Sequence, residues 1–219
     1  MDLLDFARGP AINIALAVFV FGVLWRLLAL VFLGRAPDRS VPRPGTPGPF
    51  AAAMKENLRR LWPHPAFWPA ERFAFFNGWV FHIGLAIVVF GFRPHILFIK
   101  GVTGLSWPAL PSGVIYAVGA VTAISLAAAL VKRLTNPVQR FISRFDDYLS
   151  WAVTILPVLT GLAAVGHVGA RYETLLALHI LSVALLFVWL PFGKLMHAFL
   201  VFLSRGTTGA FLARRGVQS

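Results

Sequence analysis

Five apolar runs, each about as long as a bilayer core is thick, dominate this sequence. A helix needs about 20 residues to cross a hydrocarbon core of about 30 Å. With 58% apolar and 13% charged residues, the chain has too little polar surface for a soluble domain of its length. The sequence therefore predicts an all-α integral membrane bundle of five transmembrane helices, forming one domain over residues 1–219. The predicted spans lie near residues 11–33, 73–97, 112–131, 147–166 and 174–203.

The basic residues are distributed unevenly between the two ends of these spans. In a soluble protein the net charge of +12 would suggest nucleic acid as a partner, but next to apolar spans it indicates topology, because basic loops stay in the cytoplasm. We therefore expect a multi-pass protein of the bacterial inner (cytoplasmic) membrane, with the N-terminus outside, the C-terminus in the cytoplasm and no nucleic-acid partner. Four of the 20 Lys and Arg residues fall on the outer side: Arg8, Arg93, Lys100 and Arg171.

The longest predicted loop, residues 35–72, begins at Arg35 and is rich in proline and basic residues. Inside it, apolar residues recur every three or four positions, as on one face of a helix. This stripe predicts a short helix in the cytoplasmic headgroup layer, and an irregular basic loop is the alternative. The stripe comprises Phe50, Met54, Leu58 and Leu61, beside Lys55, Arg59 and Arg60.

Cysteine is absent, which excludes disulfides, cysteine-held iron–sulfur clusters and covalent haem attachment by this chain. A metal would have to be held by histidine or carboxylate. Histidine inside a membrane is costly and usually functional, and we find three of the six well inside predicted spans. They are His82, His179 and His197, whereas His95 lies near an outer helix end.

Helical spacing predicts how these four histidines pair. His179 and His197 are 18 residues apart, which is five whole turns of a straight helix, so both rings would leave one face about 27 Å apart. Depth in the membrane then pairs His82 with His197 on the cytoplasmic side and His95 with His179 on the outer side. Two histidines from facing helices are the axial ligands expected for a b-type haem, so the sequence predicts two haems.

Several other residues near the predicted haems have two possible roles each. His95 would need a kink at Pro94 to turn its ring inward, with His167 in the outer loop as the substitute ligand or a plain interfacial role for His95. Arg26 and Lys194 could pair with haem propionates, or extend to the headgroups. The remaining histidine, His64, is expected at the cytoplasmic surface. Three glycines of the second span could make room for a porphyrin or for a packed helix: Gly78, Gly84 and Gly91.

At these positions the sequence resembles the gamma subunit of respiratory nitrate reductase and the related cytochrome b subunits of sulfite-reductase-associated and heterodisulfide-reductase-like complexes. The resemblance covers about residues 73–200. Two positions depart from the nitrate enzyme's pattern: Phe92 stands where that pattern has a histidine, and no basic residue opens the third span. The matching pieces are Phe81-His82-Ile83-Gly84, Lys132-Arg133 with Pro137, Arg140 and Asp146, Leu178-His179, and the stretch from Pro191 to His197.

The resemblance implies a subunit with two b haems that transfers electrons between quinone and a cytoplasmic iron–sulfur or catalytic subunit of a respiratory complex. His82, His179 and His197 match the family's haem ligands. No residue is assigned a catalytic role beyond a quinone site. The rival hypothesis is a haem-poor membrane anchor or a proton-relay or transport protein. The lack of Asp and Glu away from the ends of the predicted spans is evidence against a relay.

Overall fold

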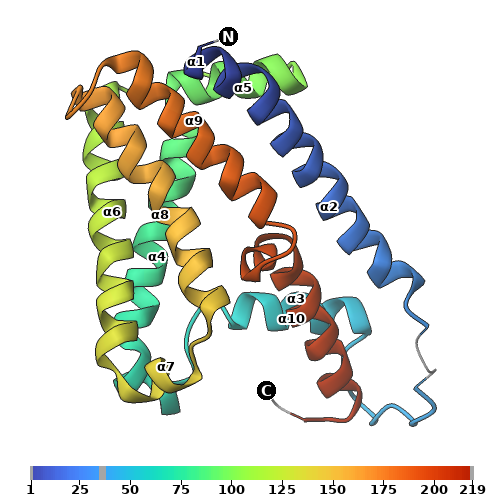
Figure 1. The fold of residues 1–219 in the computed structure, drawn as a ribbon. Coiled ribbons are helices and arrows are strands. Elements are labelled where there is room, and N and C mark those ends of the chain that lie inside the picture. The colour runs from blue at the N-terminus through green and yellow to red at the C-terminus, as the bar shows by residue number, and fades with distance from the viewer. Residues whose placement is uncertain (1, 35–37, 218–219) are drawn as a thin grey trace.

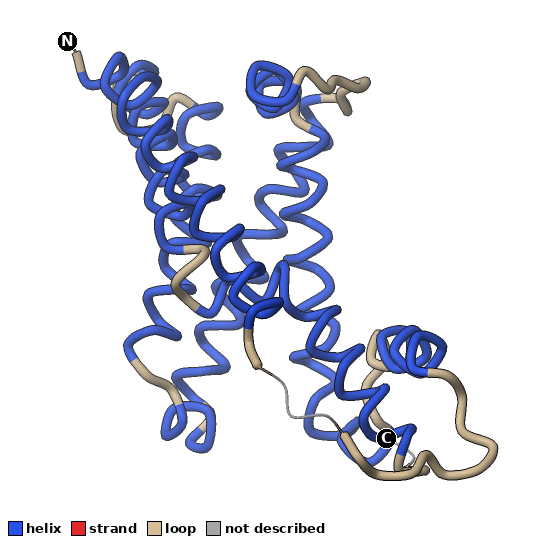
Figure 2. Tube along the Cα trace, turned by 90° about the vertical axis from the view of Figure 1, so that its right-hand side faces the viewer, coloured by secondary structure: helices blue, strands red, loops and turns tan. Residues whose placement is uncertain are grey.

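The computed structural model describes residues 2–34 and 38–217, which form helices joined by loops and contain no strand within those ranges (Figure 2). Arg35, at the start of the predicted basic loop, lies outside the described residues. The all-helical prediction is therefore confirmed for the described part of the chain.

Six helical segments of the described chain are long and apolar enough to cross a membrane, so the protein is a multi-pass membrane protein by length and composition. The first combines a short α1, a π-helical turn at Ala7–Ala11 and α2. The sequence predicted five spans. The six segments are Leu3–Phe32, Pro65–Gly91, Ser112–Thr135, Phe145–Gly166, Tyr172–Trp189 and Lys194–Arg214.

The helices follow one another around the bundle in a simple order (Figure 1). Helix α4 packs on α6, α6 on α8, α8 on α9, and α9 on α2, while α3 packs on α10 near the C-terminal end. Short helices α5 and α7 lie at opposite ends of the bundle. The α-helices are α1 (Leu3–Phe6), α2 (Ile12–Phe32), α3 (Pro49–Arg59), α4 (Trp68–Gly91), α5 (Arg93–Thr103), α6 (Ser112–Thr135), α7 (Pro137–Ile142), α8 (Phe145–Gly166), α9 (Tyr172–Trp189) and α10 (His197–Arg214).

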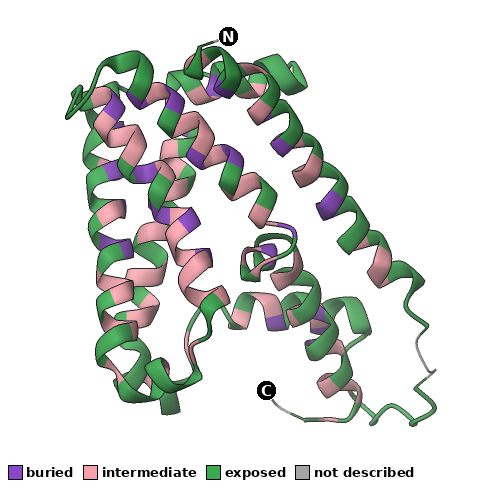
Figure 3. Ribbon diagram, in the orientation of Figure 1, coloured by how far each residue is buried: buried purple, intermediate pink, exposed green. Residues whose placement is uncertain are grey.

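Many large apolar side chains are exposed. Few residues of the ribbon are coloured as buried (Figure 3). On α2, for example, Phe21 is 72% exposed, Val31 75% and Phe32 81%. A soluble protein rarely exposes apolar surface so continuously. These faces therefore contact lipid.

The predicted span 174–203 is interrupted in the structure. Helix α9 ends at Trp189, and α10 begins at His197 after a single 3-10 turn at Lys194–Met196. Pro191 lacks an N–H and cannot continue the hydrogen bonding of α9. A Cβ atom at Gly193 would overlap the Trp189 indole, so the bend also requires glycine there. The prediction that one straight helix carries His179 and His197 on the same face is therefore wrong.

The predicted span 73–97 also divides in two. Helix α4 ends at Gly91, Phe92 is extended at φ −84° and ψ 127°, and α5 starts at Arg93. Pro94 suits the first turn of this new helix, where a missing N–H costs nothing. The chain therefore breaks at Phe92, two residues before the predicted kink.

The predicted amphipathic helix is present as α3. Its stripe residues Phe50, Met54 and Leu58 are exposed, and its opposite face packs on α10, where Gly206 and Gly209 allow a close approach. The irregular-loop alternative is therefore wrong for Pro49–Arg59. The exposed stripe is suited to contact the headgroup layer of a membrane.

Candidate functional site

The structure brings His82 of α4 next to His197 at the start of α10. Their ring centroids are 6.1 Å apart, with an angle of 82° between the ring planes. Both side chains are exposed, and Phe81 stacks on His82 at 4.4 Å. We refer to His82 and His197 as the inner pair.

His95 of α5 lies next to His179 of α9. Their ring centroids are 6.0 Å apart, with 23° between the ring planes. Both side chains are partly buried, and Phe92 packs edge-on against His95 at 5.3 Å. The break at Phe92 turns His95 toward α9. We refer to His95 and His179 as the outer pair, after the side of the membrane expected from the sequence.

All four of these imidazoles are held in the same way, through Nδ1. A carbonyl oxygen can only accept a hydrogen bond, so each Nδ1 carries a proton, and in the neutral ring Nε2 then keeps the free lone pair. Burial also lowers the pKa of His95, which favours its neutral form. The acceptors are Gly78 O for His82 at 2.7 Å, Lys194 O for His197 at 2.8 Å, Val88 O for His95 at 2.9 Å and Pro157 O for His179 at 3.0 Å.

The centroid separations of both pairs are compatible with two imidazoles on opposite sides of one metal ion. A metal–imidazole nitrogen bond is about 2 Å long, so one metal between two such rings holds their centroids about 6 Å apart. The planes of axial rings can rotate about the line joining them, so the different angles of the two pairs are both acceptable. Among the described residues no three His, Asp or Glu side chains gather at a point. Within the part of the chain that the structure describes, each pair thus consists of two imidazoles without a third such side chain beside them.

The paired histidines come from helices whose main packing partners lie elsewhere. Helix α4 packs on α6, whereas α9 packs on α8 and α2. In both pairs the imidazoles therefore extend between helices that are not packed into one closed core. The two ring contacts join the α4–α5 segment to the α9–α10 segment.

His179 has a supporting environment that sequence reasoning missed. Its Nδ1 donates to the carbonyl of Pro157 on α8, and Thr160 Oγ1 lies 3.3 Å from the same nitrogen. A Cβ atom at Gly161 would lie 3.1 Å from His179 Cε1, so glycine leaves room for the ring. A proline followed four residues later by glycine, within one predicted span, was the signal available in the sequence.

Two of the three glycines predicted near a porphyrin serve helix packing. A Cβ atom at Gly84 would overlap the Thr122 hydroxyl of α6, and one at Gly91 would lie 2.9 Å from Leu110 Cδ1. These two support the close-packing alternative. Gly78 has open space at its Cβ position, and its carbonyl holds His82.

The other two histidines lie away from the pairs. His167 ends α8 in the left-handed conformation at φ 51°, and its ring contacts Tyr172 at 5.4 Å. His64 has the opposite tautomer, because its Nδ1 accepts the Ala66 N–H at 3.2 Å. The structure thus places His95, rather than His167, beside His179.

The two basic residues predicted near haem propionates differ in their surroundings. Lys194 Nζ lies 2.6 Å from a carboxylate oxygen of Asp147 at the head of α8, so its ammonium already has a partner in the protein. Arg26 is exposed on α2, one turn beyond Gly22. A Cβ atom at Gly22 would lie 2.7 Å from Pro191 Cγ, so α2 contacts the break before His197 at Gly22. Arg26 lies one helical turn further along α2 from this contact.

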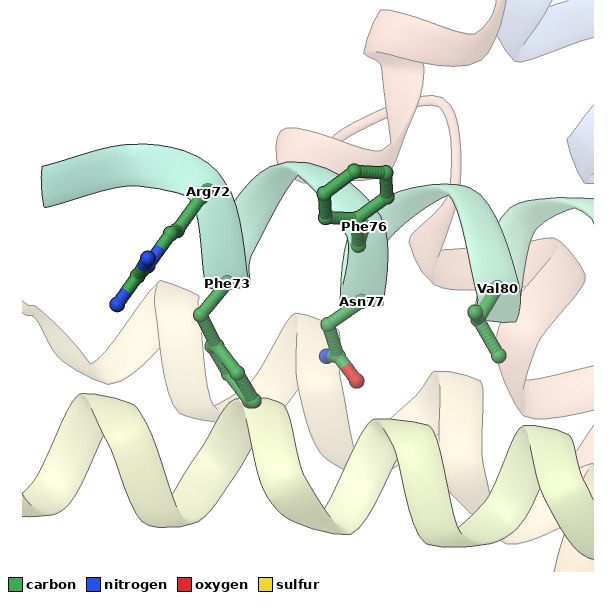
Figure 4. Close-up of a pocket in the computed structure, with 5 residues that line it drawn as sticks. All are labelled: Arg72, Phe73, Phe76, Asn77 and Val80. Carbon is green, nitrogen blue, oxygen red and sulfur yellow. The ribbon is translucent and has the colours of Figure 1, made fainter. Parts of the chain in front are cut away.

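A hollow of about 420 Å³ lies along α4 (Figure 4) and is separate from both pairs. One of its two polar lining residues, Asn77, donates to the Ser125 carbonyl at 3.0 Å and accepts from the Ser125 hydroxyl at 2.7 Å. These bonds hold α4 on α6. The residues lining the hollow are Arg72, Phe73, Phe76, Asn77 and Val80.

No protein-family model matches this chain, and no solved structure matches it. A protein of Nitratidesulfovibrio vulgaris (strain ATCC 29579), described simply as a protein, is 31% identical over 214 residues. The alignment covers 96% of this chain and 94% of that protein. The similarity therefore includes all the helices that carry the two histidine pairs. This chain belongs to the same family as the Nitratidesulfovibrio vulgaris protein.

Proposed function

We propose that this chain is a di-haem cytochrome b subunit that carries electrons between membrane quinone and a cytoplasmic iron–sulfur or catalytic partner. The observation that carries the proposal is the geometry of the two pairs. Each brings two imidazoles to a centroid separation of 6.0 or 6.1 Å, with every Nδ1 bonded to a carbonyl. Four Nε2 atoms would then be available as ligands, two for each haem iron.

The protein's part in this function is to fix the ligands. His82 and His197 would hold one haem, and His95 and His179 the other. A bound b-type haem supplies a reversible one-electron carrier. Carbonyl acceptors at Nδ1 raise the basicity of Nε2 and fix the direction of each ring, as hydrogen bonds to ligand histidines do in metal sites generally.

Support for the quinone and the cytoplasmic partner comes from the resemblance to the nitrate reductase gamma subunit. The basic loops add a physical argument, because an excess of Lys and Arg on one side of the membrane attracts acidic protein surfaces. Arg26, on the α2 face near the break before His197, is available to a propionate of the inner haem. We assign no such role to Lys194, which pairs with Asp147.

We propose five crossings of the bacterial inner membrane, with α9 and α10 sharing the last one. Helix α9 starts at the end of the bundle where the N-terminus lies, and α10 finishes at the end where the C-terminus lies (Figure 1). With the basic residues on the cytoplasmic side, the N-terminus is outside. A reporter active only in the cytoplasm, fused after Ser219, should therefore give signal, and silence in a stable fusion would reverse the topology.

Electron transfer is tested with protein purified in detergent and then reconstituted in lipid vesicles. Adding a short-chain quinol should produce the absorbance spectrum of a reduced b-type haem. A soluble one-electron oxidant should then restore the oxidised spectrum. The matched control is His64→Ala, a histidine outside both pairs, which should behave as wild type. If a b-type haem is present but quinol does not change its oxidised spectrum, quinone is not the partner. The absence of any b-type spectrum would favour a haem-poor anchor or a proton relay.

A further inference from the structure

A basic pocket of about 440 Å³ lies beside α3 and α10, near the C-terminal end of the bundle and separate from both histidine pairs. Three parts of the chain form it: the end of α3, the loop that leads to α4, and the middle of α10. The residues lining it are Arg59, Arg60, Trp62, Pro63, His64, Phe67 and Arg205.

Two of its arginines are oriented by one buried carboxylate. Glu56 is 3% exposed and accepts from Arg59 Nε at 3.1 Å and from Arg59 Nη2 at 3.0 Å. Arg60 Nε donates to the same carboxylate. Each guanidinium has five N–H donors, so both retain donors for another ligand. Arg205 lines the pocket as well, so three guanidinium groups stand against the one carboxylate that orients two of them, and the surplus charge is positive.

The histidine of the pocket adds a donor of the same kind. His64 Nδ1 accepts the Ala66 N–H at 3.2 Å, so the proton of the neutral ring is on Nε2. The charged and titratable side chains lining the pocket are therefore all donors. A compact oxyanion with several acceptor oxygens, such as a phosphate group, matches such a set of donors.

The surroundings of the pocket are those of a membrane–water interface. Trp62 stacks on Trp68 at 5.7 Å and meets Phe75 edge-on at 5.1 Å. Tryptophan and other amphipathic aromatics are enriched where a protein crosses the headgroup layer. The exposed apolar stripe of α3, represented by Met54 and Leu58, lies on the helix that ends at the pocket.

We propose that this pocket binds the phosphate group of an anionic phospholipid, with Arg59, Arg60 and Arg205 as its charged donors and His64 as an additional one. Basic pockets at the ends of membrane helices are suited to such headgroups. Free phosphate has the same chemistry and is the other source that the test must separate. The proposal is independent of haem binding.

The test measures lipid binding to the purified full-length chain by native mass spectrometry. Defined amounts of phosphatidylglycerol or phosphatidylcholine are added to delipidated protein, with and without inorganic phosphate as competitor. The variants are Arg205→Gln and His64→Gln, and the matched control is Lys55→Gln, which removes one charge from the exposed side of α3 outside the pocket. Circular dichroism checks that each variant is folded.

We expect one phosphatidylglycerol molecule to bind in preference to phosphatidylcholine. Affinity should fall about tenfold in Arg205→Gln, as for loss of a charge-assisted hydrogen bond, fall less in His64→Gln, and stay unchanged in Lys55→Gln. Binding of inorganic phosphate with no preference for phosphatidylglycerol would assign the site to free phosphate. Equal losses in Arg205→Gln and Lys55→Gln, or no saturable binding of either anion, would overturn the proposal. If Arg205→Gln does not fold, an unchanged affinity in His64→Gln would overturn it.

Discussion

The imidazoles of His95 and His179 lie 6.0 Å apart, and each is hydrogen-bonded to a helix other than its own. His95 Nδ1 bonds to Val88 of α4 at 2.9 Å, and His179 Nδ1 bonds to Pro157 of α8 at 3.0 Å. The position of each ring thus depends on two helices. This arrangement fixes the outer pair although Phe92 occupies the position where the resembling family has a histidine.

The outer pair predicts a specific pattern of haem loss. His95→Ala and His179→Ala should each remove the same haem, because each would leave one axial ligand. His167→Ala should keep both haems, since its ring contacts Tyr172 rather than His179. Spectral redox titration of the three variants checks this. Loss of a haem in His167→Ala with retention in His95→Ala would move the ligand to the outer loop.

The inner pair predicts a second, independent pattern. His82→Ala and His197→Ala should each abolish one and the same spectral component and leave the outer component in place, since their rings face each other at 6.1 Å. The same redox titration measures it, with His64→Ala as the control. If the two variants removed different components, the assignment of this pair would be wrong.

Gly161 predicts an effect on haem binding by a residue that is not a ligand. A Cβ atom there would lie 3.1 Å from His179 Cε1 and 3.3 Å from its Nδ1, so a larger side chain must displace the ring. Gly161→Val should weaken haem binding at the outer pair by about 10 to 100-fold, as disruption of ligand-supporting contacts does in metal sites. Haem content during dilution in detergent measures this loss.

The control for this prediction is Gly113→Val on α6, where nothing lies within 4 Å of the added Cβ. It should keep both haems. If Gly161→Val retains its outer haem as well as the control does, Gly161 does not support haem binding at the outer pair.

Gly84 predicts an effect on stability. The Thr122 hydroxyl occupies the position that a Cβ atom at Gly84 would take, and it donates to the Val118 carbonyl at 2.7 Å. Gly84→Ala should cost about 1–3 kcal/mol of unfolding free energy through overpacking of α4 on α6. Combining it with Thr122→Ala should recover most of that cost. Denaturation of the two single variants and the double variant in detergent tests this coupling, and additive effects would contradict it.

The sequence was sufficient to predict an all-helical membrane protein and to predict which histidines lie side by side, because length, hydropathy and approximate depth follow from residue spacing. It did not reveal the interruption between α9 and α10. The apolar run continues through Leu190 and Phe192, and the consequence of Pro191 and Gly193 depends on how Trp189 packs, since its indole N–H donates to Ser150 of α8 at 2.9 Å.

Partners of charged side chains were likewise beyond sequence reasoning. Lys194 lies about one turn from His197, and from the sequence it could pair with a haem propionate or extend to the headgroups. In the structure, the break before α10 places it against Asp147 at the head of α8. Such a contact depends on the arrangement of two helices, and the sequence pattern reports the spacing within one.

The most direct measurement of the central claim is the haem content of the purified chain. A reduced-minus-oxidised spectrum combined with a pyridine haemochrome assay and protein quantification gives the number of b haems per polypeptide. The two histidine pairs predict a b-type spectrum with two haems per chain, with the number falling to one in His82→Ala and in His179→Ala. One haem per wild-type chain would remove one of the two sites, and a chain purified from haem-replete cells with no b-type spectrum would contradict the account.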